Sequence, residues 1–421
     1  MLRTALVAVP LAVLARFAAR RPVHNTVTGQ GLHYFSRPGN GGVRRAPILA
    51  EHAWRGEDLR RGPASRWKAP LTSAEAAELL AAVKTFDASG ADLHTITAAT
   101  FPLPLLAPKI AALRTELTRG LGFFVWQGVP VSQMTVGQAE ICFAALGQHL
   151  GIAGAQNNDG DLVGHVTDVG GDAATGRLYR THAEIGFHCD AADVVGLLCL
   201  GTSATGGASR LISSATVYNE MLKDHADLVP TLYEPFLLDT RGTGGVDFLP
   251  VEFVRAESIG GGSGEESKEG GVRTFYHKEY FSSAYRHPAA GKIPKLQQEA
   301  LDAYGAITER PDLRLDMQLA VGDAQFVNNH YLLHARAAYE DRRPTSPTTK
   351  ETEEKAAAAG KKDDEAAPRG HRRHMLRLWL SLDTADMPLA AKASKLSHKA
   401  VMASRIVKGK VRGFVQRRGG E

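Results

Sequence analysis

The sequence predicts an α+β protein in which helices flank a β-rich core, and the architecture expected for that core is a double-stranded β-helix, or jelly-roll. Two observations support this prediction. Short apolar runs have the length and composition of strands, and they lie at 123–131, 194–201, 315–323 and 376–382. Longer runs with helical periodicity lie between them. The organisation fits one domain of a size that can bury a substantial core, and no run of 18 or more apolar residues suggests a transmembrane span.

The N-terminal 50 residues carry seven arginines and no acidic residue, and Arg16 interrupts their apolar start. This composition is typical of an organelle transit peptide, so residues 1–50 are predicted to be a basic targeting segment and the protein to be mitochondrial, with the cytoplasm as the alternative. A secretory signal or short membrane anchor is the rival, although no clear cleavage site stands out. Cys142, Cys189 and Cys199 lie in apolar segments, which indicates a reducing compartment rather than a disulfide framework.

Positive charge gathers at both ends of the chain. Residues 1–50 carry +7 and residues 390–421 carry +8, so a chain of +5 leaves −10 for residues 51–389. A nucleic-acid-binding face on the core is therefore not expected. The basic tail at 391–421 is predicted to be solvated, with contact to anionic lipid or a partner as the alternative.

Helical patterns occur at 71–86, 135–151 and 295–307. Thr72 or Ser73 is expected to cap the first helix, and Gly151 to end the second.

The segment 186–200 places His188 and Asp190 two residues apart in a strand-like run. Side chains two apart on a strand share a face, so this pair can hold one ion. Imidazole and carboxylate are two of the three ligands of the facial triad that binds non-haem Fe(II). A second pair, His225 and Asp227, lies in a helical pattern at 216–233, where residues two apart point to nearly opposite sides. Only the strand pair is therefore a candidate.

The third ligand must come from another part of the chain, and the segment 326–341 offers two histidines. We prefer His334, because it follows the apolar Leu332 and Leu333. His330 stands beside two asparagines and is expected in a loop. For any single histidine, a surface or hydrogen-bonded core position is the alternative.

The segment 371–382 alternates with a period of two, as in a strand with one apolar face. The other face carries Arg373 and Arg377. Guanidinium groups that point inward need anions, and their planar geometry suits carboxylates. The pattern predicts a clamp for a dicarboxylate co-substrate, with a merely solvated face as the alternative.

Four motifs in this order resemble the taurine dioxygenase and 2,4-dichlorophenoxyacetate dioxygenase-like family of Fe(II)- and 2-oxoglutarate-dependent oxygenases. The family order is His-x-Asp, a Gly-Gly-x-Ser/Thr turn, a distal histidine and an arginine on a late strand. The matching residues are His188-Cys189-Asp190, Gly206-Gly207-Ala208-Ser209, His334, and Arg373 with Arg377. The resemblance covers roughly residues 70–390 and implies a clavaminate synthase-like jelly-roll.

The resemblance also implies a role for each matching residue. The residues that would bind Fe(II) are His188, Asp190 and His334. Ser209 and Arg373 would hold the distal carboxylate of 2-oxoglutarate, and Arg377 matches an arginine that faces an anionic substrate in some relatives. Two departures are Cys189, where a small hydroxylated residue is usual, and the long spacing from His334 to Arg373.

The long spacing is explained by residues 344–370, a Pro-, Lys-, Glu- and Ala-rich tract without large apolar residues. Such a tract cannot bury enough surface to offset the entropy of ordering, so it is predicted to be a disordered insertion. A Gly- and Ser-rich stretch at 257–271 is predicted to be a second. The dioxygenase domain is accordingly expected at 70–390.

The expected function is that of a dioxygenase that uses Fe(II), 2-oxoglutarate and O2, supported by ascorbate, to hydroxylate a small organic substrate with release of succinate and CO2. A trimethylammonium substrate is disfavoured, because three cysteines cannot build the zinc module of the carnitine-pathway relatives. One alternative is a weak or inactive family member that senses iron and 2-oxoglutarate, which Cys189 suggests. Another is a membrane-associated organellar scaffold that acts through its basic ends. A homo-oligomer is compatible with the sequence.

Overall fold

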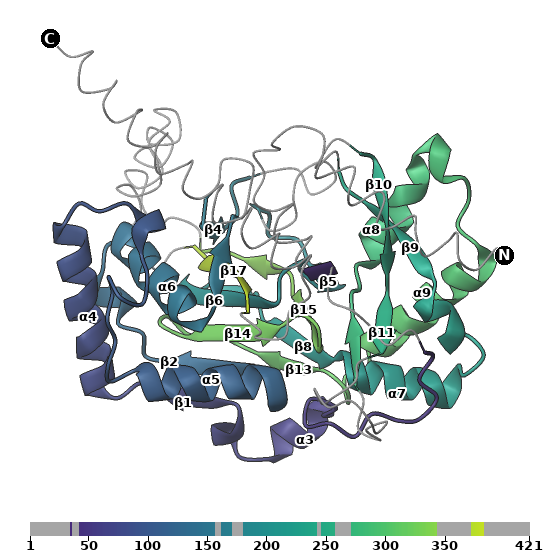
Figure 1. Cartoon of the computed structure of the whole chain (residues 1–421), viewed down its shortest axis with the longest axis horizontal. Helices are drawn as coiled ribbons and strands as arrows, with labels where there is room; N and C mark the ends of the chain where they lie inside the picture. The colour runs from purple at the N-terminus through teal and green to yellow at the C-terminus, as the bar shows by residue number, and fades with distance from the viewer. Residues whose placement is uncertain are drawn as a thin grey trace, which may run out of the picture.

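The computed structural model describes residues 34–35, 42–155, 161–170, 180–241, 246–256, 271–342 and 372–382 (Figure 1). The insertions predicted at 257–271 and 344–370 lie outside these residues, apart from Gly271, as do the tail at 391–421 and most of residues 1–50. The expectations of disorder, of a mitochondrial location and of a scaffold therefore stay predictions. In the part that is described, no helix combines the length and apolar character needed to cross a membrane.

Two β-sheets form the core. The larger has the strand order β1-β2-β14-β6-β17-β3, with β4 also paired to β17, and the smaller has the order β13-β8-β15-β5. The strands of the larger sheet are β1 (Lys68–Pro70), β2 (Phe123–Gln127), β14 (Ala324–Asn328), β6 (Val194–Gly201), β17 (His374–Ser381), β3 (Ile152–Gly154) and β4 (Val163–Val166). Those of the smaller are β13 (Leu315–Met317), β8 (Ser209–Ser213), β15 (Leu332–Arg336) and β5 (Ile185–His188).

Apolar side chains pack in three layers around these sheets. Between the sheets, Val195 and Val327 of the larger one share a cluster with Leu211 and Leu332 of the smaller one. Because side chains alternate along a strand, the next residue, Leu333, faces the opposite way. This face-to-face packing of two sheets confirms the predicted jelly-roll with flanking helices.

Helices cover the two outer faces (Figure 1). The outer face of the larger sheet packs against α4 (Ser73–Ala88), α5 (Ala107–Arg119) and α6 (Val136–Leu150). The smaller sheet packs against α7 (Ser214–Asp224) and α9 (Lys295–Thr308). Apart from short 3-10 helices, the other elements with defined bounds are two helices, α3 (Gly56–Arg61) and α8 (Lys278–Ser283), and three strand pairs. The strand pairs are β7 (Thr205–Gly206) with β16 (Tyr339–Glu340), β9 (Pro235–Asp239) with β10 (Phe248–Glu252), and β11 (Val254–Ala256) with β12 (Val272–Thr274).

The predicted helix ends are mostly confirmed. Thr72, one of the two candidates, caps α4 in a reciprocal capping box with Glu75, and Gly151 follows the last turn of α6. The helix expected over 216–233 is wrong in extent, because α7 ends at Asp224 with His225 as its C-cap. His225 and Asp227 are therefore not two residues of one continuous helix.

The predicted alternation of β17 is confirmed. Its even-numbered leucines, Leu376, Leu378 and Leu380, lie in the cluster under the helices. Met375 and Trp379 lie in the cluster between the sheets. Arg377, between them on the same face, therefore also starts from the inner side of the sheet.

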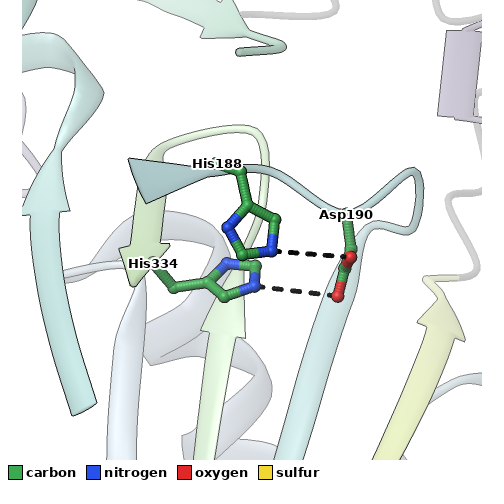
Figure 2. A group of neighbouring side chains, drawn as sticks. All are labelled: His188, Asp190 and His334. Carbon is green, nitrogen blue, oxygen red and sulfur yellow. Dashed lines mark ion pairs between the residues drawn. The ribbon is translucent and has the colours of Figure 1, made fainter. Parts of the chain in front are cut away.

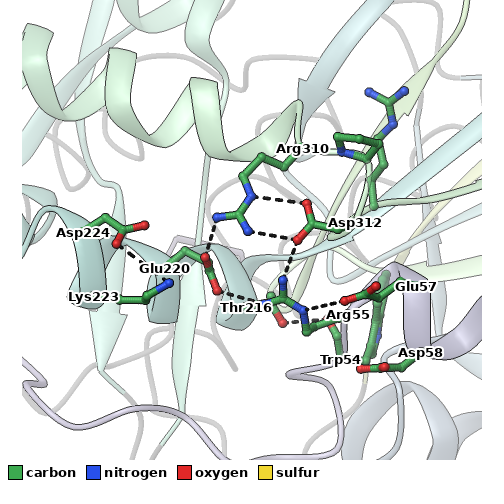
Figure 3. A network of polar contacts seen from close by, with 12 residues as sticks. Trp54, Arg55, Glu57, Asp58, Thr216, Glu220, Lys223, Asp224, Arg310 and Asp312 are labelled. Carbon is green, nitrogen blue, oxygen red and sulfur yellow. Dashed lines mark hydrogen bonds and ion pairs between the residues drawn. The ribbon is translucent and has the colours of Figure 1, made fainter.

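A network of ion pairs joins three distant segments beside the smaller sheet (Figure 3). Glu220 on α7 pairs with Arg55 at 2.9 Å and with Arg310 after α9. Asp312 accepts from the same two arginines, at 2.9 Å from Arg310. The network thus connects the start of α3 with α7 and with the segment between α9 and β13.

Candidate metal centre

Two neighbouring strands bring the predicted histidines together. His188 ends β5 and pairs directly with His334 on β15, and their ring centroids lie 4.3 Å apart. Asp190 follows β5 and turns back toward both rings (Figure 2). His188 Nε2 lies 4.0 Å from Asp190 Oδ1, and His334 Nε2 lies 3.7 Å from Asp190 Oδ2.

The ligand atoms of these three residues all lie within 4.8 Å of one another, and no other group of this kind lies among the described residues. Two imidazoles and one carboxylate form the donor set of a facial triad, which suits Fe(II) and leaves positions open. The structure thus brings the three predicted residues together, while their role as ligands stays a prediction.

The strand expected to run through 186–200 is wrong in one respect, because β5 stops at His188 and β6 begins at Val194. Asp193 explains the break: it is fully buried and accepts hydrogen bonds from His330 Nε2 at 2.7 Å and from the amide of Leu382 at 2.8 Å. The turn around Asp193 places β6 in the other sheet. Asp190 consequently belongs to a turn rather than to a strand.

Neighbouring groups orient the triad. His188 Nδ1 lies 2.9 Å from the carbonyl oxygen of Gly186, to which it donates, and this leaves Nε2 free for a metal. Trp379 Nε1 donates to Asp190 Oδ2 at 2.8 Å, and Arg377 Nη1 lies 3.8 Å from the same oxygen. Both groups come from the inner face of β17.

The electrostatics favour the forms that bind a divalent cation. Burial by itself raises the pKa of the Asp190 carboxyl, but the Arg377 guanidinium and the two imidazoles more than offset this and lower the pKa to about 2. Burial, followed by the nearby charge of His188, lowers the pKa of His334 to about 3. An ionised carboxylate and a neutral imidazole at pH 7 are the metal-binding forms, so these residues fit the ion.

His330 and Cys189 do not belong to the triad. His330 lies in the turn between β14 and β15, as expected, but it is buried, paired with Asp193 and stacked on Tyr34 at 4.2 Å. Cys189 points to the opposite side from its neighbours, into the core beneath α7, and burial raises its thiol pKa to about 12. The thiol thus faces away from the candidate ligands.

Arg373 and Ser209 both lie near the turn formed by Gly206 and Gly207. Arg373 is 3% exposed, and its Nη1 has no hydrogen-bond partner among the described residues. Gly207 has φ of +71°, and a Cβ there would lie 3.0 Å from Arg373 Cδ, so glycine makes room for this side chain. Ser209 donates to Gln325 Oε1 at 2.9 Å.

Sequence reasoning missed two groups beside the triad. His277 forms an isolated β-bridge with His188, and the two ring centroids lie 5.2 Å apart. Burial and the charge of His188 hold the pKa of His277 well below its usual range. Arg336 and Tyr339 form the second group, close to Arg373. Neither His277 nor this pair belongs to a spaced motif, so only the folded chain reveals them.

A jelly-roll whose inner face presents two histidines and a carboxylate has the architecture of non-haem iron oxygenases. The model of the taurine catabolism dioxygenase TauD, TfdA family matches residues 88–346. The chain belongs to this family, which makes it an oxidoreductase of the dioxygenase class. The resemblance inferred from the sequence is thereby confirmed, and with it the expected Fe(II) and 2-oxoglutarate.

Individual relatives agree with the family assignment. FR-33289 synthase of Streptomyces rubellomurinus is 26% identical over 344 residues, which cover 81% of this chain and 92% of the relative. The taurine hydroxylase-like protein SAT17 of Stachybotrys chartarum is 28% identical over 284 residues, 64% of this chain and 69% of the relative.

Solved structures with the same fold include an asparagine oxygenase in complex with Fe(II), 3-hydroxyasparagine and succinate, with a TM-score of 0.51 and 16% identity over 75% of this chain and 94% of that one. The non-haem iron oxygenase OrfP with Fe and α-ketoglutaric acid has a TM-score of 0.50 and 14% identity, over 77% and 98%. At such identities the likeness establishes the fold alone.

Proposed function

We propose that the protein hydroxylates a small organic substrate in a reaction that consumes 2-oxoglutarate and O2 and releases succinate and CO2. The observation that carries this proposal is the convergence of His188, Asp190 and His334 from β5, the following turn and β15. Iron bound there would supply the oxygen chemistry. The protein would supply the geometry and a site largely shielded from water.

Each residue near the centre has a definable task in this reaction. Trp379 and Arg377 fix the carboxylate of Asp190, so that its second oxygen and both Nε2 atoms can meet one ion. Arg373, buried and with an unpartnered N–H among the described residues, is available for the distal carboxylate of the co-substrate.

An anionic substrate is favoured. Arg377 places a cation 3.8 Å from Asp190, on the inner face of the larger sheet. A Streptomyces relative, 25% identical over 240 residues, is named a uridine-5'-phosphate dioxygenase, and its substrate carries a phosphate. The resemblance to relatives in which this arginine faces an anion points the same way.

The test is succinate production from 2-oxoglutarate by the purified chain with Fe(II), ascorbate and O2, with and without candidate acidic substrates. We expect 2-oxoglutarate-dependent succinate formation that rises when the correct substrate is added. Binding of iron and 2-oxoglutarate without any turnover would instead support the sensor alternative. Absence of both binding and turnover would contradict the proposal.

A further inference from the structure

Three buried side chains beside the candidate metal centre carry polar atoms that have no hydrogen-bond partner among the described residues. Arg336, Tyr339 and Arg373 are 5%, 3% and 3% exposed. The unpartnered atoms are Nε and Nη1 of Arg336, the hydroxyl of Tyr339 and Nη1 of Arg373. Buried donors without acceptors are rare and costly, so a cluster of them indicates a missing acceptor.

The three side chains lie against one another. The guanidinium carbon of Arg336 lies 4.9 Å from the centroid of the Tyr339 ring, and that of Arg373 lies 5.3 Å from it. Two guanidinium groups held this close in a buried place favour an anion bound beside them.

Two described acidic side chains in this region are engaged with other groups. Asp341 Oδ1 accepts the backbone amide of Arg373 at 2.7 Å, and Asp168 Oδ2 accepts from His182 at 2.7 Å. Neither satisfies the unpartnered N–H groups of the arginines. The hydroxyl of Ser209 is likewise engaged, because it donates to Gln325.

The cluster is placed to meet a molecule that also reaches the metal. Arg336 follows His334 by two residues on β15, so both side chains leave the same face, roughly 7 Å apart along the strand. Ser209, on β8, stands directly opposite Arg336 in the register. A short dicarboxylate with one end at the metal can extend its other end toward this cluster.

We propose that Arg336 and Tyr339 complete, with Arg373, the site for the distal carboxylate of 2-oxoglutarate. The proposal rests on the proposed function, because it requires the keto acid end of this molecule to lie at the metal. Arg373 and the Tyr339 hydroxyl donate to the carboxylate, and Arg336 adds a second cation. Nη2 of Arg336 meanwhile donates to the carbonyl oxygens of Thr181, at 2.8 Å, and Ala183.

This arrangement links the co-substrate to the metal ligands. Thr181 and Ala183 belong to the segment that leads into β5, which ends at His188. Arg336 therefore spans from the carboxylate site to the backbone that positions a predicted iron ligand.

The experiment is isothermal titration of the anaerobic, iron-loaded protein with two ligands, 2-oxoglutarate and 2-oxopentanoate. The second has the same keto acid end and the same five-carbon chain but lacks the distal carboxylate. Tyr339→Phe and Arg336→Gln should each weaken 2-oxoglutarate binding about tenfold or more and leave 2-oxopentanoate binding nearly unchanged. Arg336→Lys should restore part of the loss, because it keeps the charge.

Tyr304→Phe is the matched control, since Tyr304 is also a buried tyrosine but lies on α9 in the core behind the smaller sheet. It should bind both ligands as the unsubstituted protein does. Equal losses for both ligands in Arg336→Gln, or unchanged 2-oxoglutarate binding in Tyr339→Phe, would overturn the proposal. An unsubstituted protein that binds the two ligands equally, or neither, would instead contradict the proposed function.

Discussion

Two histidines four residues apart have different tasks. His334 faces Asp190 between the sheets, whereas His330 is paired with the buried Asp193. His334→Ala should therefore remove bound iron and 2-oxoglutarate turnover with little loss of stability. His188→Ala and Asp190→Ala should do the same, because three ligands leave no spare.

His330→Ala is expected to show the opposite behaviour. It should keep the iron and lower the free energy of unfolding by about 1–3 kcal/mol, because the buried carboxylate of Asp193 loses a donor. Metal analysis and urea denaturation of the variants separate the two effects. Loss of iron in His330→Ala together with retention in His334→Ala would show that the distal ligand is wrongly assigned.

The backbone conformation of Gly207 leaves room for the side chain of Arg373. Its positive φ disfavours any other residue, and a Cβ would meet the side chain of Arg373 at 3.0 Å. Gly207→Ala should therefore displace Arg373 and weaken 2-oxoglutarate binding several-fold while iron binding persists. Gly90→Ala is the control, because its φ is also positive, at +62°, but a Cβ there meets nothing within 4 Å. Isothermal titration of both variants with 2-oxoglutarate measures the effect. Equal 2-oxoglutarate affinities in Gly207→Ala and in the control would refute this role for Gly207.

Much of the candidate site could be predicted from the local sequence, because side chains alternate between the two faces along an extended segment. His188 and Asp190 lie on the side opposite Phe187 and Cys189, as alternation requires, although Asp190 is in a turn. The choice of His334 depended on its apolar neighbours and agrees with the geometry. Arg336 and Tyr339 could not be found this way, since what marks them is burial without partners, a property of the folded chain.

Among the structural elements, the described residues that flank the predicted insertion at 344–370 lie close together. Asp341 Oδ1 accepts the backbone amide of Arg373 at 2.7 Å, so a short connection can replace the intervening residues. Deleting residues 345–368 should leave turnover and Tm nearly unchanged, because the tract has no large apolar residue to bury. Thermal denaturation and the succinate assay test this. Insoluble protein or a large drop in Tm would contradict it.

The elements also show where sequence patterns stop being sufficient. The alternation of β17 was predictable because one face meets helices and the other meets the opposite sheet. The break between β5 and β6 could not be predicted, because it depends on hydrogen bonds that Asp193 accepts from His330 and Leu382 in distant parts of the chain. Likewise α7 ends earlier than its apolar periodicity suggests.

The ion-pair network in Figure 3 predicts that the stability of the folded molecule depends on pH. Burial opposes ionisation of Glu220, but Arg310 and Arg55 hold its pKa below the ordinary 4.5. The hydrogen bond from Arg310 holds the pKa of Asp312 below 3.8. Carboxyls with depressed pKa values stabilise the folded state above their ordinary pKa, and this contribution is lost as pH falls through the lowered values.

We therefore expect Tm to be steady near neutrality and to fall as the pH drops below about 4.5. Glu220→Gln should lower Tm at neutral pH and make its acid dependence shallower. Glu234→Gln, at an exposed position outside this network, is the comparison. Scanning calorimetry between neutral and acidic pH gives the answer, and parallel curves for Glu220→Gln and the unsubstituted protein would rule out the network as the cause.

The direct pairing of His188 with His334 has a mechanical consequence. In the described structure β5 is an edge strand that pairs within its sheet only with β15, and the register is interrupted between His334 and Arg336. An ion held by both histidines would cross-link β5 and β15 at the residues where the two strands pair. Loading with metal should then slow amide hydrogen exchange in β5 far more than in β6. The metal centre would thus also stabilise an edge strand of the smaller sheet.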